Sequence, residues 1–319
     1  MKNVAIVGAS GLVGQEIIKV LNEEGLLSNI KLRLYVSNKS AGKRIIVCGK
    51  EYLLEELSSE VLKRKHDVVF FSAGDEISKV WAPKFVKKGA FVIDNTNAFR
   101  RESFVPLVVP EINASQIGDS KLIANPNCST IQLAVVLKRL LNVSKIKSVI
   151  VSTYQSVSGA GKKALLDFEN NTSFEIKEGI TNNVIAKIGK INNQGFSTEE
   201  DKIMFETNKI LNSSIHVVAT AVRVPVCFCH SESVFVEFDN EICLHDIKEA
   251  LICEHVVFDD QEIFLPTKCV HSNKTFVCRL RQTGKNQIAF FVVADNLRRG
   301  AAFNAVKIFS YLLTQKTTK

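Results

Sequence analysis

The first 125 residues contain five short, mostly hydrophobic runs, each of which ends in small or polar residues. The runs lie at 3–7, 31–36, 67–71, 91–93 and 121–124. Between the first two runs, Val13, Ile17, Val20 and Leu21 recur at helical spacing. Buried strands that alternate with helices are typical of a parallel sheet. We therefore expect a doubly wound, Rossmann-like α/β domain whose polar loops meet at the carboxyl edge of the sheet.

A different pattern follows residue 128. Hydrophobic residues at helical spacing from Ile131 to Leu141 predict a helix, and Ser197-Thr198-Glu199-Glu200 is typical of a capping box that begins another helix, ending near Leu211. Strands are predicted at 149–153, 217–226 and 233–238, and a long ordered loop at 170–194. We therefore expect an α+β domain with a mixed, largely antiparallel sheet that has one covered face, a common surface for a dimer.

The domain boundaries follow from this change of pattern and from the last segment of the chain. Residues 300–313 predict an amphipathic helix that is long enough to pack back on the first domain. We therefore expect a first domain of residues 1–127 completed by 297–319, and a second domain of residues 128–296. A length of 319 residues is sufficient for a hydrophobic core in each.

Composition and charge argue against several classes of protein. The chain is 46% hydrophobic and 23% charged, as globular proteins are, and has no signal peptide and no run of ~18 apolar residues that could span a membrane. We therefore expect a cytoplasmic protein. The net charge of +8 comes from dispersed lysines and arginines, which favours small anionic ligands over nucleic acid.

The eight cysteines are expected to be reduced thiols, because they form no Cys-x-x-Cys pair and the chain carries no secretion signal. The Cys227-x-Cys229-His230 cluster has the period of a strand. No second pair completes four ligands, so we expect no metal.

One cysteine has an unusual setting, in Asn125-Pro126-Asn127-Cys128-Ser129-Thr130. Asn127 and its neighbours are N-cap residue types, and Pro126 makes the turn into the helix rigid. Cys128 therefore lies at a helix N-terminus, where unpaired N–H groups and the helix dipole favour an anion and stabilise a thiolate. We interpret Cys128 as a nucleophile. The alternative, a small buried hydrophobic residue, does not explain the polar surroundings.

The turn at 8–14, GASGLVG, lies between a strand and a helix, the context of a dinucleotide-binding fingerprint. Its spacing is Gly-x-x-Gly-x-x-Gly, and the alternative is a glycine-rich turn without a ligand. The second strand ends in Ser37-Asn38-Lys39-Ser40, where an NAD site usually has an acid for the ribose. Hydroxyl, amide and lysine groups there favour a 2′-phosphate, hence NADP. The expected cofactor contacts in these loops are Gly8, Ser10, Gly11, Leu12, Val13, Gly14, Ser37, Asn38 and Ser40.

Several motifs of the chain resemble those of the aspartate-semialdehyde dehydrogenase family. They are GASGLVG (8–14), FSAG (71–74), DNTNAFR (94–100), VPLVVPEIN (105–113), NPNCST (125–130), YQSVSGAGK (154–162), ETNKIL (206–211), RVPV with HSESV (223–234), and DNLRRGAAFNAV (295–306). They span nearly the whole chain in family order. The resemblance implies a glyceraldehyde-phosphate-dehydrogenase-like architecture, a homodimer or tetramer, and NADPH-dependent reduction of L-aspartyl 4-phosphate to L-aspartate 4-semialdehyde and phosphate. That reaction serves lysine, diaminopimelate, threonine and methionine biosynthesis.

The resemblance also implies roles for single residues. Cys128 would attack the acyl phosphate and carry a thioester, His230 would be the general acid or base, and Gln155 would orient the substrate. Glu206 would take the substrate amino group and Arg223 its carboxylate. The phosphate ligands would be Lys209, Arg100 and Asn127. The additional cofactor contacts would be Ser72, Ala73, Gly74, Ser158, Gly159 and Asn296.

Spacing allows two of these pairs to be examined independently. Glu206 and Lys209 would share one face of a helix, for which the alternative is a surface ion pair. Arg223 and His230 are seven residues apart, and would lie on opposite faces of one straight strand. Because Pro225 is poorly tolerated in a central strand, we predict a break between them.

Two features depart from the family pattern. Asp75 stands where a second glycine is expected after FSAG, and an acid there would repel the cofactor phosphates. The 176–196 segment contains no recognisable motif, so no site residue is assigned to it. The alternatives are an N-acetyl-γ-glutamyl-phosphate reductase, which the ETNK and RVPV segments disfavour, and a non-catalytic NADP-binding dimer, which would have lost Cys128 or His230.

Overall fold

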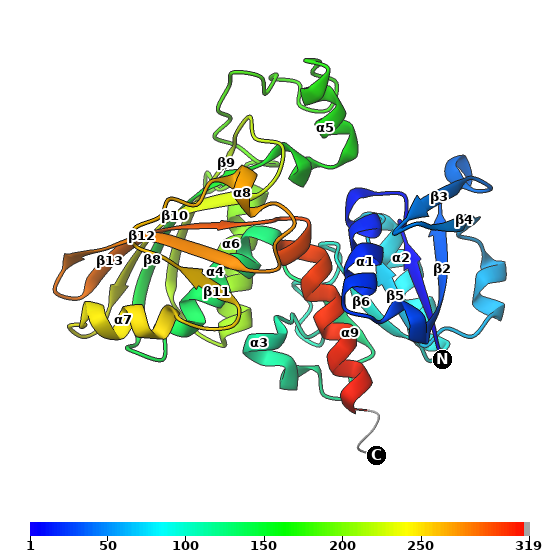
Figure 1. Ribbon diagram of the computed structural model, residues 1–319, viewed down its shortest axis with the longest axis horizontal. Coiled ribbons are helices and arrows are strands. Elements are labelled where there is room, and N and C mark those ends of the chain that lie inside the picture. The colour runs from blue at the N-terminus through cyan, green and yellow to red at the C-terminus, as the bar shows by residue number, and fades with distance from the viewer. Residues whose placement is uncertain (316–319) are drawn as a thin grey trace. The chain divides into compact units, whose positions relative to one another are not determined.

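The computed structural model describes residues 1–315, and the chain divides into two compact units (Figure 1). The first unit consists of Met1–Pro126 together with the segment that begins at Ala301. The second unit is Asn127–Gly300. Each is described separately below.

The first unit contains a seven-stranded sheet in the order β3-β4-β2-β1-β5-β6-β7. The strands are β1 Lys2–Val7, β2 Ile30–Val36, β3 Arg44–Val47, β4 Lys50–Glu56, β5 Val68–Phe71, β6 Phe91–Asp94 and β7 Leu122–Ala124. All neighbours pair in parallel except β3, which is antiparallel to β4. Because the strand order reverses at β1, the loops after β1 and β5 lie side by side at a topological switch point. The predicted doubly wound domain is confirmed.

Helices cover both faces of this sheet. The helices are α1 Leu12–Glu23, α2 Asp75–Lys87, α3 Pro110–Asn113 and α9 Phe303–Gln315. Alternate residues of β1 explain why its sequence is hydrophobic throughout: Val4 and Ile6 join a core with residues of α1 and α9, whereas Ala5 and Val7 join a second core with Phe85 of α2.

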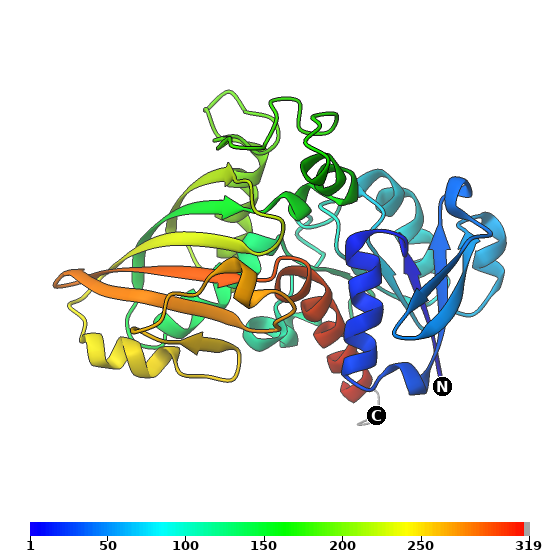
Figure 2. The ribbon, with the colours of Figure 1, turned by 45° about the horizontal axis from the view of Figure 1, so that its top comes forward.

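The second unit contains a six-stranded sheet in the order β11-β12-β13-β10-β8-β9. The strands are β8 Ile146–Gln155, β9 His216–Arg223, β10 His230–Phe238, β11 Val256–Phe258, β12 Thr275–Gly284 and β13 Gln287–Ala294. The pairs β8–β10, β10–β13 and β12–β13 are antiparallel, and β8–β9 and β11–β12 are parallel. The predicted mixed, largely antiparallel sheet is confirmed, and its long strands can be followed in Figure 2.

The main helical layer covers one face of the second sheet: α4 Cys128–Leu140 contacts β8, β10 and β13, and α6 Thr198–Leu211 contacts α4 and β9. The other helices are α5 Lys162–Glu169, α7 Leu244–Leu251 and α8 Pro266–Cys269. α8 lies on the opposite face, where Cys269 packs with Cys278 and Val293. Val149 and Val151 of β8 point to the covered face and are fully buried, whereas Ile150 and Tyr154 on the other face are 51% and 37% exposed. In the described part of the chain, residues 1–315, no helix could cross a membrane.

The capping box and the strand break are both present. The Ser197 hydroxyl accepts from the Glu200 nitrogen, and the Glu200 carboxylate accepts from the Ser197 nitrogen at 2.6 Å, so α6 begins as predicted. The strand predicted at 217–226 is wrong at its end, because β9 stops at Arg223, before Pro225. β10 then begins at His230, and the break between Arg223 and His230 is confirmed.

Candidate active site

The three loops expected to hold a dinucleotide follow β1, β2 and β5, which are neighbours in the first sheet. Gly8 has a φ of +89°, and a Cβ there would lie 2.6 Å from the carbonyl carbon of Ser72. Only glycine fits that close approach between the loops after β1 and β5. Gly11 is the N-cap residue of α1, so no side chain competes for the free N–H groups of its first turn. The loops of 8–14, 37–40 and 72–74 therefore form a cradle suited to a pyrophosphate.

Asp75 is a structural residue in this fold. It is the first residue of α2, where a carboxylate suits the helix dipole, and its Oδ1 accepts from the Asn97 nitrogen at 2.9 Å. That bond connects α2 to the loop that follows β6. In the same loop Arg100, which is 6% exposed, donates from Nη2 to the Asn95 carbonyl at 3.0 Å. The departure from the family glycine is thus explained by a contact within the protein.

Cys128 is the first residue of α4, as predicted. The N-cap residue Asn127 accepts from the nitrogens of Ser129 and Thr130 through its Oδ1, at 3.0 and 3.1 Å. A Cβ on Gly300 would lie 2.8 Å from the Cβ of Cys128, so glycine leaves room beside the thiol. Cys128 also interacts electrostatically with Arg223. A helix N-terminus and a nearby guanidinium both favour the thiolate.

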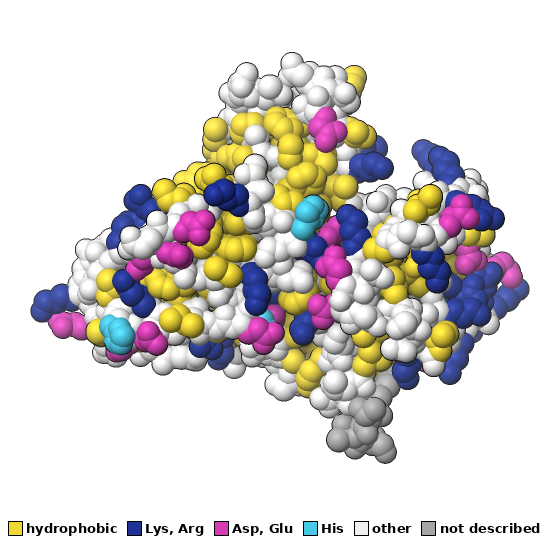
Figure 3. Space-filling view, viewed as in Figure 1, with side chains coloured by type: hydrophobic (Ala, Val, Ile, Leu, Met, Phe, Trp, Pro, Cys, Tyr) yellow, Lys and Arg dark blue, Asp and Glu magenta, His cyan; other side chains and the backbone are white. Residues whose placement is uncertain are grey.

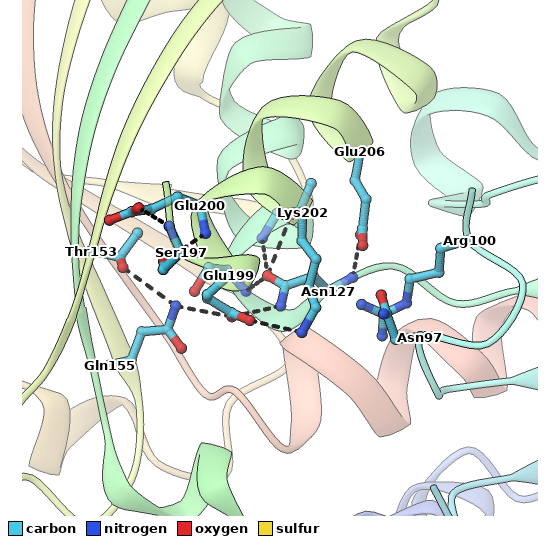
Figure 4. A network of polar contacts seen from close by, with 12 residues as sticks. Asn97, Arg100, Asn127, Thr153, Gln155, Ser197, Glu199, Glu200, Lys202 and Glu206 are labelled. Atoms are coloured by element: carbon cyan, nitrogen blue, oxygen red, sulfur yellow. Dashed lines mark hydrogen bonds and ion pairs between the residues drawn. The ribbon is translucent and has the colours of Figure 1, made fainter. Parts of the chain in front are cut away.

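A buried carboxylate stands beside the N-terminus of α4 (Figure 4). Oε1 of Glu199 accepts from Asn127 Nδ2 at 2.7 Å and from Gln155 Nε2 at 3.1 Å, and Oε2 lies 3.0 Å from Lys202 Nζ. Burial alone would raise the pKa of Glu199, but Lys202 and the two amide donors together lower the pKa to about 2. Glu199 is therefore a charged group at neutral pH.

The pair predicted to bind substrate, Glu206 and Lys209, has different contacts. Glu206 is buried, and its Oε2 accepts from the backbone nitrogen of Asn127 at 2.6 Å, which supports the turn before Cys128. Because Glu206 is buried, the alternative of a surface ion pair with Lys209 does not apply. Lys209 Nζ lies over the ring of Phe205, 6.0 Å from its centroid.

The sequence reasoning did not select Glu199 and Lys202, although a signal exists. They have the same Glu-x-x-Lys spacing as Glu206 and Lys209, one helical segment earlier. The sequence places Glu199 within the predicted capping box, but in the structure Glu200 forms the box with Ser197. Glu200 therefore has a structural role at the start of α6, whereas Glu199 contributes to the site.

Arg223 and His230 both contact Ser156, the residue that follows β8. Arg223 pairs with Gln155 in the β8–β9 register, and its Nη1 donates to the Ser156 carbonyl at 2.6 Å. His230 Nδ1 lies 3.0 Å from the Ser156 nitrogen. A Cβ on Gly159 would lie 3.0 Å from both Arg223 Nη1 and His230 Cε1.

The charges of these two side chains are strongly influenced by burial. Burial lowers the pKa of the Arg223 guanidinium, against the attraction of Glu199 and Cys128. Burial and the positive charge of Arg223 lower the pKa of His230 to about 3, and Glu199 opposes this only in part. His230 is therefore neutral at pH 7.

Ser158, Gly159 and Asn296, predicted as cofactor contacts, lie in the second unit around His230. The Asn296 side chain is buried and bonded at both ends, to the hydroxyls of Ser156 and Ser158 and to the Cys229 nitrogen. Its side chain therefore supports the histidine.

All eight cysteines are free thiols. Within residues 1–315, no three His, Cys, Asp or Glu side chains are grouped so that they could hold a metal ion.

Comparisons with known proteins agree with this arrangement. Residues 3–120 match the family model described as "Semialdehyde dehydrogenase, NAD binding domain", and residues 137–299 match "Semialdehyde dehydrogenase, dimerisation domain". The aspartate-semialdehyde dehydrogenase of Aquifex aeolicus is 42% identical, with 98% of each chain covered, and that of Helicobacter pylori is 44% identical, with 96% of each covered. The crystal structure of aspartate semialdehyde dehydrogenase II from Vibrio cholerae, complexed with ASA, has a TM-score of 0.94 at 35% identity, with 98% of each chain covered.

A dinucleotide-binding domain joined to a dimerisation domain, with Cys128 at a helix N-terminus between the two matched ranges, defines a semialdehyde dehydrogenase. Among these enzymes, the chain belongs to the aspartate-semialdehyde dehydrogenase family. It is an oxidoreductase of amino-acid biosynthesis with an NAD(P)-type binding domain. The resemblance stated from the sequence motifs is confirmed.

Proposed function

We propose that this chain reduces L-aspartyl 4-phosphate to L-aspartate 4-semialdehyde, with Cys128 as the nucleophile and carrier of a thioester. The observation that carries the proposal is the position of Cys128, at the first residue of α4, near the buried Arg223 guanidinium and directly after Asn127, which binds the buried Glu199 carboxylate. An acyl phosphate needs a strong nucleophile, and a thiolate stabilised by a helix N-terminus meets that need. In this proposal the first unit binds the dinucleotide and the second performs the chemistry and forms the dimer.

The substrate is recognised by charges that match its own. The guanidinium of Arg223 is planar and can bind the substrate carboxylate through two parallel N–H donors. One of its donors binds the Ser156 carbonyl, and the guanidinium has further N–H groups for the substrate. Glu199, charged and buried, suits the substrate ammonium group. Gln155 orients the substrate indirectly, because its side-chain amide donates to the Glu199 carboxylate. This assignment moves the ammonium ligand from Glu206, which holds the Asn127 nitrogen, to Glu199.

The phosphate requires cationic and amide groups. Lys202 is the cation next to Glu199 in the second unit, and Asn127 contributes at the helix N-terminus, where free N–H groups favour an anion. Arg100 of the first unit remains a proposed phosphate ligand. Lys209, whose ammonium lies over Phe205, is the weaker candidate.

We propose NADPH as the cofactor, which supplies a hydride when it is bound. The cradle formed by Gly8, Gly11 and Ser72 fits a pyrophosphate, because a Cβ at Gly8 would fill it. The loop of Ser37, Asn38 and Ser40 offers hydroxyl and amide groups to a 2′-phosphate. Lysine and arginine side chains gather over the edge of the first unit near β3 and β4 in Figure 3, which favours an anionic cofactor.

A homodimer through the exposed face of the second sheet is the assembly we propose. Ile150, Tyr154, Phe235 and Phe291 lie on that face, since Ile150 pairs with Phe235 across β8 and β10 and the rings of Tyr154 and Phe291 are 6.1 Å apart. Exposed aromatic and aliphatic groups on one sheet face are typical of an interface between copies. Ile150→Asp should shift the mass measured by light scattering to that of a monomer.

The test of the function is the reverse reaction, assayed as reduction of NADP⁺ by purified protein in the presence of phosphate. L-Aspartate semialdehyde should support it and N-acetylglutamate semialdehyde should not, because Glu199 needs a free ammonium group. Equal rates with NAD⁺ would contradict the role of Ser37, Asn38 and Ser40. Activity on the N-acetyl compound alone would indicate the related reductase, and activity on neither would leave a non-catalytic dimer.

A further inference from the structure

A pocket of about 380 Å³ lies in the second unit, at the end of the sheet where β8 and β9 begin. Its lining includes Ile146, the first residue of β8, and Ile215, which directly precedes β9. Gln155 and Arg223, which belong to the candidate active site, are the last residues of the same two parallel strands. Since β8 has ten residues, the pocket lies about 30 Å along the sheet from Gln155. A small molecule bound there would not reach the active site.

The helices α4 and α6 also end at this pocket. Leu141 is the C-cap residue of α4 and Asn212 that of α6, and both line the pocket. The last turn of a helix has backbone carbonyl groups without intrahelical donors, and it carries the negative end of the helix dipole. Two helix C-termini at one pocket therefore favour a positively charged group in it.

Side chains of both signs of charge stand at the rim. Lys145 Nζ lies 2.8 Å from Asp239 Oδ2, and Lys147 Nζ lies 3.0 Å from Glu237 Oε1. The Lys145 side chain is 79% exposed and that of Asp239 33%, so their ion pair is weak and each partner can turn to a ligand at little cost. The two lysines favour an anion, whereas Asp239 and the helix ends favour a cation. A phosphate ion alone or a metal ion alone would be repelled by part of the lining.

We propose that this pocket is a second ligand site, for a small amino acid bound as its zwitterion. The ligand carboxylate would bind Lys145 and Lys147, and its ammonium group would bind Asp239 and the carbonyl ends of α4 and α6. Ile146 and Ile215 are 2% and 6% exposed, so the inner lining is apolar and suits an aliphatic side chain. The volume is in the range of sites that bind small molecules. Binding there requires neither Cys128 nor the cofactor, and therefore goes beyond the proposed function.

L-Valine is a suitable probe, because it combines both charges with an aliphatic side chain. Methyl NMR on the full chain with ¹³C-labelled isoleucine reports on the pocket, and Ile146→Val and Ile215→Val identify the two signals. We expect L-valine to shift both signals to saturation, with a Kd of about 1 mM or lower. N-acetyl-L-valine lacks the ammonium group and L-valinamide lacks the carboxylate, so each should bind at least about tenfold more weakly. No saturable shift of these signals, or equal affinity for either derivative, would overturn the proposal.

Variants at the rim test the charges one at a time. Asp239→Asn and Lys145→Gln should each weaken the binding of L-valine by about tenfold or more, because each removes one charge that pairs with the ligand. Ser214→Trp, at an exposed serine of the lining, should block the pocket. Lys285→Gln is the matched control: Lys285 forms a similar exposed ion pair, 3.0 Å from Glu241, and does not line the pocket.

Lys285→Gln should bind L-valine as the wild type does. Wild-type affinity in either charge variant or in Ser214→Trp would overturn the proposal, since L-valine would then bind elsewhere. All of these positions are exposed, so the variants should fold, and thermal unfolding checks that they do. Because binding is measured without substrate or cofactor, a protein inactive on aspartate semialdehyde would refute the proposed function and leave the binding result unaffected.

Discussion

Arg223 and His230 bind the two backbone polar groups of a single residue, Ser156. The Arg223 guanidinium donates to the Ser156 carbonyl at 2.6 Å, and the Ser156 N–H donates to His230 Nδ1 at 3.0 Å. In one straight strand, side chains seven residues apart would point to opposite faces. Because β9 ends at Arg223 and β10 begins at His230, the intervening loop turns both side chains toward the same residue.

Gly159 is the residue against which both side chains pack, so Gly159→Ala should displace them. Its methyl group would lie 3.0 Å from Arg223 Nη1 and His230 Cε1, closer than ordinary contacts. Small displacements of catalytic groups are costly, and we expect kcat/KM to fall by about 10–100-fold with little change in melting temperature. Gly284→Ala is the control, because the atoms nearest to its methyl all belong to the flexible Gln287 side chain, and the only close one is the terminal Oε1 at 2.8 Å. Normal kinetics in Gly159→Ala would show that the site tolerates the shift.

Cys128→Ala should abolish turnover and leave the fold intact. Removing the sulfur removes the nucleophile, so kcat should drop by about 10⁴-fold or more. The remaining methyl is smaller than the side chain that Gly300 already accommodates. Steady-state kinetics and thermal unfolding measure the two effects, with Cys243→Ala, at an exposed thiol, as the control that keeps its activity. Near-normal turnover would remove Cys128 from the mechanism.

Much of this molecule is predictable from local pattern. The buried strands of the first unit are hydrophobic on both faces, and each ends in the small or polar residues that a sheet edge needs, so both the parallel sheet and its polar loops follow from the sequence. Asn127 and Pro126 predict the start of α4 at Cys128 for equally local reasons, as Ser197 and Glu200 do for α6.

Two kinds of feature were not predicted. The strands β12 and β13 are neighbours in the chain, but Arg279 and Gln282 interrupt the hydrophobic pattern of β12, where the register shifts. The other features depend on contacts between distant parts of the chain. Glu199 and Glu206 look equivalent in sequence, and only the fold shows that one meets Lys202 and Gln155 whereas the other meets a backbone nitrogen. Asp75 likewise finds its partner in Asn97, across a loop.

Glu199→Gln and Glu206→Gln should separate the two acids. If Glu199 holds the substrate ammonium, its neutral variant should raise the KM for aspartate semialdehyde by about tenfold or more, since a charge-assisted hydrogen bond is lost. Glu206→Gln keeps an oxygen that can accept from the Asn127 nitrogen, so it should change KM little. The Glu199 carboxylate, with a pKa of about 2, should contribute no titration to the activity between pH 5 and 9.

Steady-state kinetics with both variants decide between them. A large KM effect in Glu206→Gln, with Glu199→Gln near normal, would return the ammonium to Glu206 as the sequence motifs imply. Lys202→Ala provides a further comparison: it should raise the KM for phosphate more than Lys209→Ala does, because Lys202 is paired with Glu199, which binds Asn127 at the N-terminus of α4.

Glu232 should make the stability of the protein fall as the pH rises. Its carboxyl is fully buried in β10, and burial raises its pKa well above the ordinary value of 4.5, which the Gln132 side chain opposes only in part. Above pH 4.5 the unfolded chain releases a proton that the folded chain retains. The free energy of unfolding therefore falls by about 1.4 kcal/mol per pH unit until the pKa of the folded state is reached.

Glu232→Gln cannot ionise, so its free energy of unfolding should lack this decline. Urea denaturation from pH 5 to 8 measures the difference in slope between the variant and the wild type. Glu237→Gln, on the same strand, is the matched control: Lys147 and Ser148 lower the pKa of Glu237, so its contribution changes only below the pH range of the measurement. Parallel slopes for the wild type and Glu232→Gln would mean that the buried carboxyl ionises in the folded protein as readily as in the unfolded chain. The Glu232 side chain would then need a cationic or hydrogen-bonding partner in solution that offsets its burial.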